Sequence, residues 1–361
     1  MDRLTIRNLS KTFPGNVRAL DDVSFSVAKG EFFSVLGPTN AGKSTLLKLI
    51  AGLIGVDAGR VLIDDADMTQ AEPRLRRVSL LFQNIALFPT LSGFDNIAYP
   101  LRLAGVDEAA IRVRVAEVAA TVNVGHLLGR LPRTYSGGEQ QRVAISRALA
   151  HRSRLLMLDE PLTNLDARLR IGLRRQFRSL HRDSGQTIVY VTHDQVEAMS
   201  LSDRILIFNE GRVEQIGTPR EVYHSPATRF VAEFIGTPPM NMIDCVPSAD
   251  SRMLTIAGSN LSVQAGSFAA LPDRVAVGIR PEDVAVSRHA GDATSLPGSV
   301  VWIERLGSRN VLDFRIGSHA ARAVVPVDHP VDTTGPAWFG LPAARQHMLD
   351  RVTDRFVQRQ E

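Results

Sequence analysis

The strongest constraint on this chain is the run GPTNAGKST, from Gly37 to Thr45, which separates a β-prone segment from a helix-like one. Gly37, Gly42, Lys43 and Ser44 satisfy the pattern G-x-x-x-x-G-K-[ST], and the neighbouring EFFSVLG and STLLKLIAGL supply the strand and helix that the pattern requires. In that setting backbone N–H groups face phosphates, Lys43 reaches the β- and γ-oxygens, and Ser44 binds Mg²⁺. A chance glycine-rich turn would not need that strand and helix. The run therefore predicts a site for ATP and Mg²⁺.

Asn40 is the unusual residue of this loop, because glycine commonly stands at its position. A backbone with positive φ would explain that preference, and Asn tolerates the left-handed region at a cost of about 1 kcal/mol relative to Gly. We therefore predict an intact loop in which Asn40, Ala41 and Thr45 also contact the nucleotide. Replacement of Asn40 by Gly should leave nucleotide affinity equal or slightly better.

The order of apolar segments predicts an α/β fold of the P-loop type. The runs at 31–37, 154–160 and 187–193 are short and β-prone, and they alternate with helix-like stretches. This alternation favours a mostly parallel sheet with helices on its faces. Residues 107–128 and 136–150 are rich in Ala, Arg, Val and Leu. We interpret residues 86–150 as a helical subdomain inserted in the α/β core.

A second domain is predicted after Gly236. At 361 residues the chain is long enough for about two domains. Residues 205–217 read as a β-hairpin turning at Glu210-Gly211, and two prolines follow Gly236. Beyond them, short β-prone runs are broken by Gly, Pro and Ser, which indicates a small β-barrel or sandwich. The predicted domains are 1–236 and 237–361.

Composition narrows the class of protein. Hydrophobic residues make up 44% and charged residues 22%, which is typical of a soluble globular protein, and we find no apolar run near the roughly 18 residues of a membrane span. The charged amino terminus is unlike a secretory signal, and Cys245 is the only cysteine, so a reducing cytoplasm is expected. The net charge of +4 is spread without a run of like charges, so no nucleic-acid partner is expected.

Further motifs accompany the loop: LLMLDEP (155–161), YSGGEQQRVAISRAL (135–149), LLFQNIALFP with Gln83, YVTHD with His193, and TNLDA (163–167). Together they resemble the nucleotide-binding subunits of ABC transporters. The resemblance implies that Asp159 holds Mg²⁺ and that Glu160 activates the attacking water as general base. It also implies that Gln83 binds Mg²⁺ and senses the γ-phosphate site, and that His193 positions Glu160 and the water.

The same resemblance implies a composite site that one chain cannot complete. Ser136, Gly137 and Gly138 match the signature sequence, which contacts the ATP held by a second copy, and Asp166 would lie at the dimer seam. Glu139 stands where the family usually has glutamine. Phe13 matches the aromatic residue that stacks on adenine. A homodimer that sandwiches two Mg²⁺-ATP is therefore expected.

The carboxyl-terminal part indicates the kind of transporter. FIGTPPMN (234–241) and VGIRPEDV (277–284) resemble the TOBE-type β-domain of bacterial importers of the carbohydrate and glycerol-phosphate (maltose-type) group, whereas the closing segment matches only loosely. The resemblance implies two integral membrane permease subunits, an extracytoplasmic solute-binding protein, and a peripheral position on the cytoplasmic face of the inner membrane. Alternatives are import of a polyamine, ferric iron or another anion, and a soluble ABC-type ATPase acting on nucleic acid or ribosomes.

Overall fold

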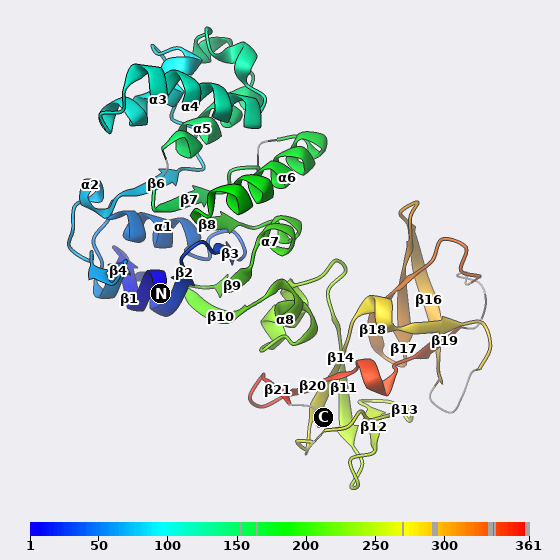
Figure 1. Cartoon of the computed structure of the whole chain (residues 1–361). Coiled ribbons are helices and arrows are strands. Elements are labelled where there is room, and N and C mark those ends of the chain that lie inside the picture. Colours follow the sequence, from blue (N-terminus) through cyan, green and yellow to red (C-terminus); the bar gives the residue numbers. More distant parts are fainter. Residues whose placement is uncertain are drawn as a thin grey trace. The chain divides into compact units, whose positions relative to one another are not determined.

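The computed structural model describes residues 1–151, 153–163, 165–268, 271–290, 295–330, 335 and 337–357. The chain divides into two compact units, residues 1–220 and 221–361 (Figure 1). No helix in the described part of the chain is both long and apolar enough to cross a membrane.

A six-stranded sheet forms the centre of the first unit, and the expectation of a mostly parallel sheet is confirmed. Its strand order is β10-β9-β3-β8-β7-β6, and only β10 runs antiparallel to its neighbour. Every residue of β3, β7 and β8 is buried, as expected for strands covered on both faces. The strands are β3 (Phe32–Leu36), β6 (Val78–Leu81), β7 (Leu155–Asp159), β8 (Thr187–Thr192), β9 (Arg204–Asn209) and β10 (Arg212–Gly217).

Each face of this sheet packs into its own hydrophobic core. One core contains Phe33, Met157 and side chains of α1 and the antiparallel sheet β2-β1-β4-β5. The other contains Phe32, Leu158 and side chains of the later helices. This division follows from the period of two along a strand. The elements of the first core are α1 (Lys43–Ala51), β1 (Asp2–Phe13), β2 (Val17–Ala28) and β4 (Ala58–Ile63), with β5 (Ala66–Asp67) and α2 (Pro73–Arg76) beside them.

The predicted helical subdomain is a separate group of helices in Figure 1, formed by α3, α4 and α5. The helices expected over 107–128 and 136–150 are present, although α4 ends at Thr121 and a 3₁₀ turn over Gly125–Leu127 follows it. Side-chain oxygens of Ser92, Asp107 and Ser136 accept backbone hydrogen bonds at the three helix starts. The bounds are α3 (Gly93–Leu103), α4 (Glu108–Thr121), α5 (Gly137–Ala150), α6 (Ala167–Ser184) and α7 (Gln195–Leu201), with a second 3₁₀ turn at Pro132–Thr134.

The hairpin expected over 205–217 is confirmed as β9 and β10. Glu210 and Gly211 both have positive φ, 45° and 77°, which is the conformation of a two-residue type I′ turn. The turn lies beside the nucleotide loop, because the Gly211 N–H donates to Ala41 O at 2.9 Å.

The second unit begins earlier than the boundary expected at Gly236. The Arg280 guanidinium donates to the backbone oxygens of Tyr223, Ala232 and Ile235, which ties α8 (Pro219–His224) and α9 (Arg229–Phe234) to the β-domain. The prolines after Gly236 therefore mark a bend within this unit. The boundary between the two units is therefore set by long-range hydrogen bonds rather than by local composition.

Two antiparallel sheets share one core in the second unit, in agreement with the β-rich domain expected there. Their strand orders are β13-β12-β11-β14-β20-β21 and β15-β19-β16-β17-β18. Residues 331–334 and 336 of the loosely matching closing segment (327–350) lie outside the described residues, as do residues 358–361. The strands are β11 (Asn241–Pro247), β12 (Met253–Ile256), β13 (Ser262–Gln264), β14 (Val275–Ile279), β15 (Ala285–Ser287), β16 (Ser295–Arg305), β17 (Asn310–Ile316), β18 (His319–Val325), β19 (Ala337–Gly340), β20 (His347–Asp350) and β21 (Phe356–Val357), with 3₁₀ turns at Pro281–Asp283 and Ala343–Arg345.

Candidate active site

The predicted phosphate, metal and catalytic residues gather at the carboxyl edge of the central sheet. The nucleotide loop follows β3, Gln83 follows β6, Glu160 follows β7 and His193 follows β8. Carboxyl ends of neighbouring parallel strands meet at one edge, which is where open α/β sheets bind ligands. A cavity of about 700 Å³ lies there. The predicted residues that line it are Phe13, Asn40, Ala41, Gly42, Lys43, Ser44, Thr45, Gln83, Glu160 and His193.

The loop has the backbone that its glycines require. Gly42 has φ of 102°, and a Cβ atom there would lie 2.4 Å from Ala19 O. A Cβ at Gly37 would lie 2.0 Å from Phe208 O. Asn40 has φ of 66°, so the left-handed conformation predicted at this position is confirmed. Gly37 and Gly42 are therefore required because backbone atoms lie too close for a Cβ atom. At Asn40 only a positive φ is required, which Asn can adopt.

Lys43 and Asp159 are opposite charges held out of water beside each other. Both are 5% exposed. Lys43 Nζ donates to the carbonyl oxygens of Gly37 and Pro38, at 2.9 and 2.8 Å. Burial lowers the pKa of Lys43 and raises the pKa of Asp159, and a hydrogen bond from Ser44 opposes the second shift. Each charged form would thus be stabilised by a partner of opposite sign, a phosphate for Lys43 and a cation for Asp159.

The donor set fits Mg²⁺. The Oδ1 atom of Asp159 is buried and has no hydrogen-bond partner within the described residues. Such an atom is costly unless a ligand satisfies it, and Mg²⁺ binds through one or two carboxylates together with hydroxyl, water and phosphate oxygens. Ser44 and Gln83, the other two predicted ligands, line the adjacent cavity. The residues present can therefore hold the metal expected from the sequence.

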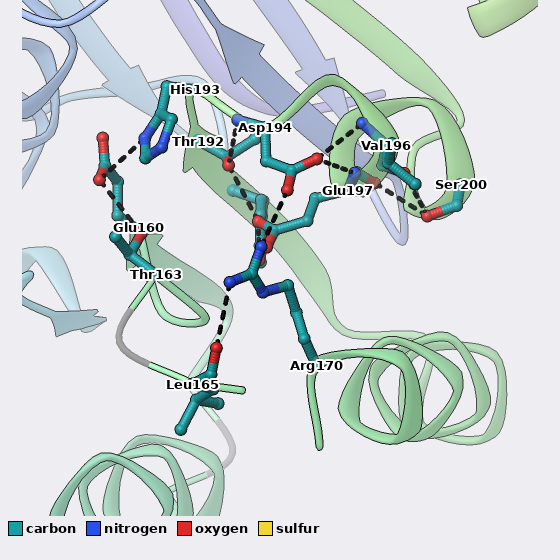
Figure 2. Close-up of polar contacts among 11 residues, drawn as sticks. Glu160, Thr163, Leu165, Arg170, Thr192, His193, Asp194, Val196, Glu197 and Ser200 are labelled. Atoms are coloured by element: carbon teal, nitrogen blue, oxygen red, sulfur yellow. Dashed lines mark hydrogen bonds and ion pairs between the residues drawn. The ribbon is translucent and has the colours of Figure 1, made fainter. Parts of the chain in front are cut away.

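Three side chains converge on one carboxylate oxygen of Glu160. Gln83 Nε2 donates to Glu160 Oε2 at 3.2 Å, Thr163 Oγ1 donates to the same atom at 3.2 Å, and His193 Nδ1 lies 3.1 Å from it. Figure 2 draws the contacts of Thr163 and His193 with this carboxylate. Glu160 itself has φ of 47°, an uncommon backbone for a non-glycine residue, and its N–H donates to Val191 O at 2.9 Å. The carboxylate is thereby held at the cavity wall.

Phe13 lies at the end of β1 and is 37% exposed, with Lys11 Nζ 5.8 Å from its ring centroid. An exposed ring on the wall of this cavity is in the right place to stack on a base.

Ser136, Gly137, Gly138 and Asp166 do not line this cavity. Ser136 is the N-cap of α5 and forms a capping box with Glu139, whose Oε2 accepts from Ser136 N at 2.8 Å. The carboxylate of Glu139, the residue that differs from the usual signature, therefore caps the amino terminus of α5. Asp166 is the exposed N-cap of α6 and accepts from Leu169 N at 2.9 Å. In the TNLDA run, Asn164 lies outside the described residues.

A second cavity of about 610 Å³ lies at the opposite edge, by the amino ends of β7 and β8. Its Arg3 and Arg154 both bond to Asp64, and its Arg114 donates to backbone oxygens of α5. These pairings account for the arginines as structural residues, so the cavity beside Lys43 remains the candidate active site.

Arg170 and Glu197 are among the residues near the site that the sequence reasoning missed. Arg170 is one of several arginines on α6, and its spacing gives no signal that separates it from the others. Glu197 stands three residues after Asp194, a capping-box spacing that predicts an exposed helix start. In the structure Glu197 is 2% exposed and accepts from Tyr190 and Thr192 instead. These hydrogen bonds to side chains of β8 could be identified only from the structure, which places β8 beside α7.

Comparison with known proteins gives two family matches and close relatives. Residues 20–163 match the family described as ABC transporter, and residues 277–349 match the TOBE domain. The sn-glycerol-3-phosphate import ATP-binding protein UgpC of Bordetella avium (strain 197N) is 42% identical over 88% of this chain and 87% of that protein. Its counterpart in Salmonella paratyphi A (strain ATCC 9150 / SARB42) is 40% identical over 99% of this chain and 100% of that protein.

A solved structure is similar to the first unit. The structure described as a dimeric, post-hydrolysis state of the ATP-binding cassette MJ0796 bound to ADP and Pi is 30% identical, with a TM-score of 0.56 over 60% of this chain and 99% of that one. The match extends the likeness from sequence to fold.

Proposed function

Because the chain belongs to the ATP-binding proteins of ABC transporters, which are ATPases coupled to transport and use ATP with Mg²⁺, we propose that it energises import of a carbohydrate or glycerol-phosphate-type solute. The similarity over nearly the full length to proteins named for sn-glycerol-3-phosphate import carries this proposal. It extends through the TOBE match, beyond the ATPase core that transporters of many solutes have in common.

In the proposed reaction, Glu160 accepts the proton of a water whose oxygen attacks the γ-phosphorus of ATP. The bond from that phosphorus to the bridging oxygen breaks, and ADP and phosphate leave. The convergence of Gln83, Thr163 and His193 on Glu160 Oε2 supports this role, because it leaves the carboxylate fixed at the cavity wall. Lys43 exchanges its backbone carbonyl partners for phosphate oxygens. Asp159 and Ser44, with Gln83 nearby, would hold Mg²⁺, and the bound ion would supply positive charge against the transferred phosphoryl group.

The predicted signature and dimer-seam residues, which do not line the nucleotide cavity of their own chain, indicate the partners. Ser136, Gly137 and Asp166 are exposed on helix starts away from the cavity, which supports a homodimer in which each copy contacts the nucleotide of the other. We further propose that the dimer binds two integral membrane permease subunits from the cytoplasmic face of the inner membrane. Solute would reach those subunits from an extracytoplasmic binding protein.

Uptake by whole cells tests the solute. Cells that lack the gene are complemented with the wild-type chain or with Glu160→Gln, and entry of labelled sn-glycerol 3-phosphate, maltose, a polyamine and ferric iron is compared. We expect only the wild-type chain to restore uptake, and only for glycerol phosphate or a carbohydrate. Restored uptake of a polyamine or iron alone would reject the proposed solute class.

A pull-down tests the assembly separately from the solute. Glu160→Gln should retain ATP binding but hydrolyse ATP about 10²- to 10⁴-fold more slowly, because the general base is lost. With ATP present it is purified from detergent-solubilised native membranes, and the proteins that accompany it are identified by mass spectrometry. Two multi-span membrane proteins are expected. Ribosomal or DNA-associated partners without a membrane protein would overturn the transport assembly.

A further inference from the structure

The proposed catalytic carboxylate belongs to a set of contacts between the segments that follow β7 and β8, and Figure 2 shows its members. Glu160 Oε2 contacts His193 and Thr163. Two residues after Thr163, the backbone oxygen of Leu165 accepts a hydrogen bond from Arg170, and Arg170 also reaches Asp194, the residue after His193. Two segments far apart in sequence, those after β7 and β8, are thus joined twice. Glu160 makes one junction and Arg170 makes the other.

Arg170 spans the two segments with separate nitrogens. Its Nη2 donates to Leu165 O at 3.0 Å, and its Nη1 donates to Asp194 Oδ2 at 3.4 Å. The Arg170 side chain is 32% exposed and that of Asp194 is 25% exposed, so the ion pair is partly shielded from water. Because α6 begins beside Leu165 with Asp166 as its N-cap, Arg170 lies one helical turn from the residue expected at the dimer seam.

The segment that carries His193 is held on both sides of that residue. Before it, Thr192 Oγ1 donates to Glu197 Oε2 at 2.9 Å. After it, Asp194 Oδ1 accepts from Val196 N at 2.8 Å and caps α7, while Oδ2 faces Arg170. His193 itself has a side chain that is 45% exposed. Its position therefore depends on its two neighbours rather than on packing of the imidazole.

The positive charge of Arg170 matters because two acidic groups lie near it. Asp194 and Glu197 are neighbouring acidic groups, and Asp194 raises the pKa of Glu197 in addition to the larger effect of burial. The guanidinium of Arg170 acts in the opposite direction on that pKa. A neutral side chain at this position would lose both hydrogen bonds and the positive charge that opposes the effect of Asp194 on Glu197.

We propose that Arg170 is a positioning residue for ATP hydrolysis, because it fixes Asp194 to Leu165 and so keeps His193 within reach of Glu160. A displacement of Asp166 by a second copy of the chain would be passed through the same side chain to His193. Arg170 touches neither nucleotide nor metal in this scheme. The inference rests on the proposed roles of Glu160 and His193.

Steady-state ATP hydrolysis by the purified full-length chain tests the proposal. Arg170→Met is expected to lower kcat about tenfold and to leave the KM for ATP within about twofold, because the change affects geometry rather than nucleotide binding. Arg170→Lys keeps the positive charge but has a single ammonium group in place of the planar guanidinium. Its kcat should therefore lie between those of Arg170→Met and the wild type.

The matched control is Arg178→Met. Arg178 lies on the same helix and likewise links α6 to a later segment, through Leu201 O at 2.9 Å and Asp203 Oδ1 at 3.0 Å, but it does not reach the segment of His193. Its removal should lower thermal stability about as much as removal of Arg170 and leave kcat within about twofold of wild type. Equal loss of kcat in both variants would show a general effect on α6 and overturn the proposal.

A double-mutant cycle with His193→Ala separates the inference from its premise. If Arg170 acts through His193, the double variant hydrolyses ATP within about twofold of His193→Ala alone. Losses that multiply would overturn the inference while leaving the role of His193 intact. Normal hydrolysis by His193→Ala would instead reject the proposed role of His193 itself, and the role of Arg170 with it.

Discussion

Replacement of Gly42 by Ala tests whether the geometry of the nucleotide loop, rather than its composition, determines binding. Gly42 is the N-cap of α1 and has φ of 102°. An ideal Cβ there would lie 2.4 Å from Ala19 O and 3.2 Å from Phe208 Cε1. The first of these neighbours is backbone of β2, which forms a sheet with β1 and cannot move aside as a flexible side chain could.

Two costs contribute to the expected magnitude. Holding an alanine at so positive a φ costs about 1–3 kcal/mol, and overlap with a fixed carbonyl adds about 1 kcal/mol or more. The loop can avoid both by shifting, but it then loses the alignment of N–H groups that faces the phosphates. A total of about 3 kcal/mol corresponds to roughly a hundredfold increase in the Kd for nucleotide.

Titration calorimetry with ADP and Mg²⁺ measures the effect without hydrolysis. Asn40→Gly is the matched control, because it lies two residues away at φ of 66° and should bind equally well or slightly better. A thermal melt of each variant confirms that the fold persists. The reasoning is refuted if Gly42→Ala binds within about threefold of wild type, and a large loss in Asn40→Gly would reveal an unrecognised role of the Asn side chain.

Three further predictions concern charge, capping and the second unit. Because burial lowers the pKa of Lys43 and the protonated form binds phosphate, ADP affinity should fall as the pH rises through that lowered pKa, and titrations in buffers of different ionisation enthalpy should detect proton uptake there. Glu139→Ala should cost about 1 kcal/mol of stability through loss of the capping box, whereas Glu139→Gln should retain both stability and turnover, as thermal melts and ATPase assays can check. Arg280→Met should destabilise the second unit by about 2–4 kcal/mol, because three backbone oxygens lose a charged donor. Urea unfolding followed by the fluorescence of Trp302 and Trp338, both in that unit, would measure this, and an unchanged transition would contradict it.

Local patterns were sufficient where the structure is set by neighbours in sequence. The loop between β3 and α1, the hairpin at Glu210-Gly211 and the helix at Ser136 each depend on a few consecutive residues, and each was predicted. The parallel order of the buried strands followed from their alternation with helices. The family resemblance implied that His193 positions Glu160, but the contact of Gln83 with Glu160 was not predicted, because the two residues lie far apart in the chain.

Sequence reasoning failed where the same residue type at the same spacing can make different hydrogen bonds. Glu139 and Glu197 both stand at capping-box spacing, but only Glu139 uses it. The uses of Arg170 and Arg280 depend on carbonyl oxygens whose positions are known only after the chain has folded. Such partners carry no periodicity, so a single sequence cannot identify them.

The two cores on opposite faces of the central sheet have a mechanical consequence. Phe32 and Phe33 are consecutive residues that contribute to different cores, so the sheet acts as a partition between α1 on one side and the helices of the subdomain on the other. The nucleotide loop lies at the carboxyl edge of this sheet, and at the same edge Gln83 and His193 contact Glu160. Core substitutions on the subdomain side should therefore change packing on one face of the sheet and leave in place the side chains that support α1 on the other.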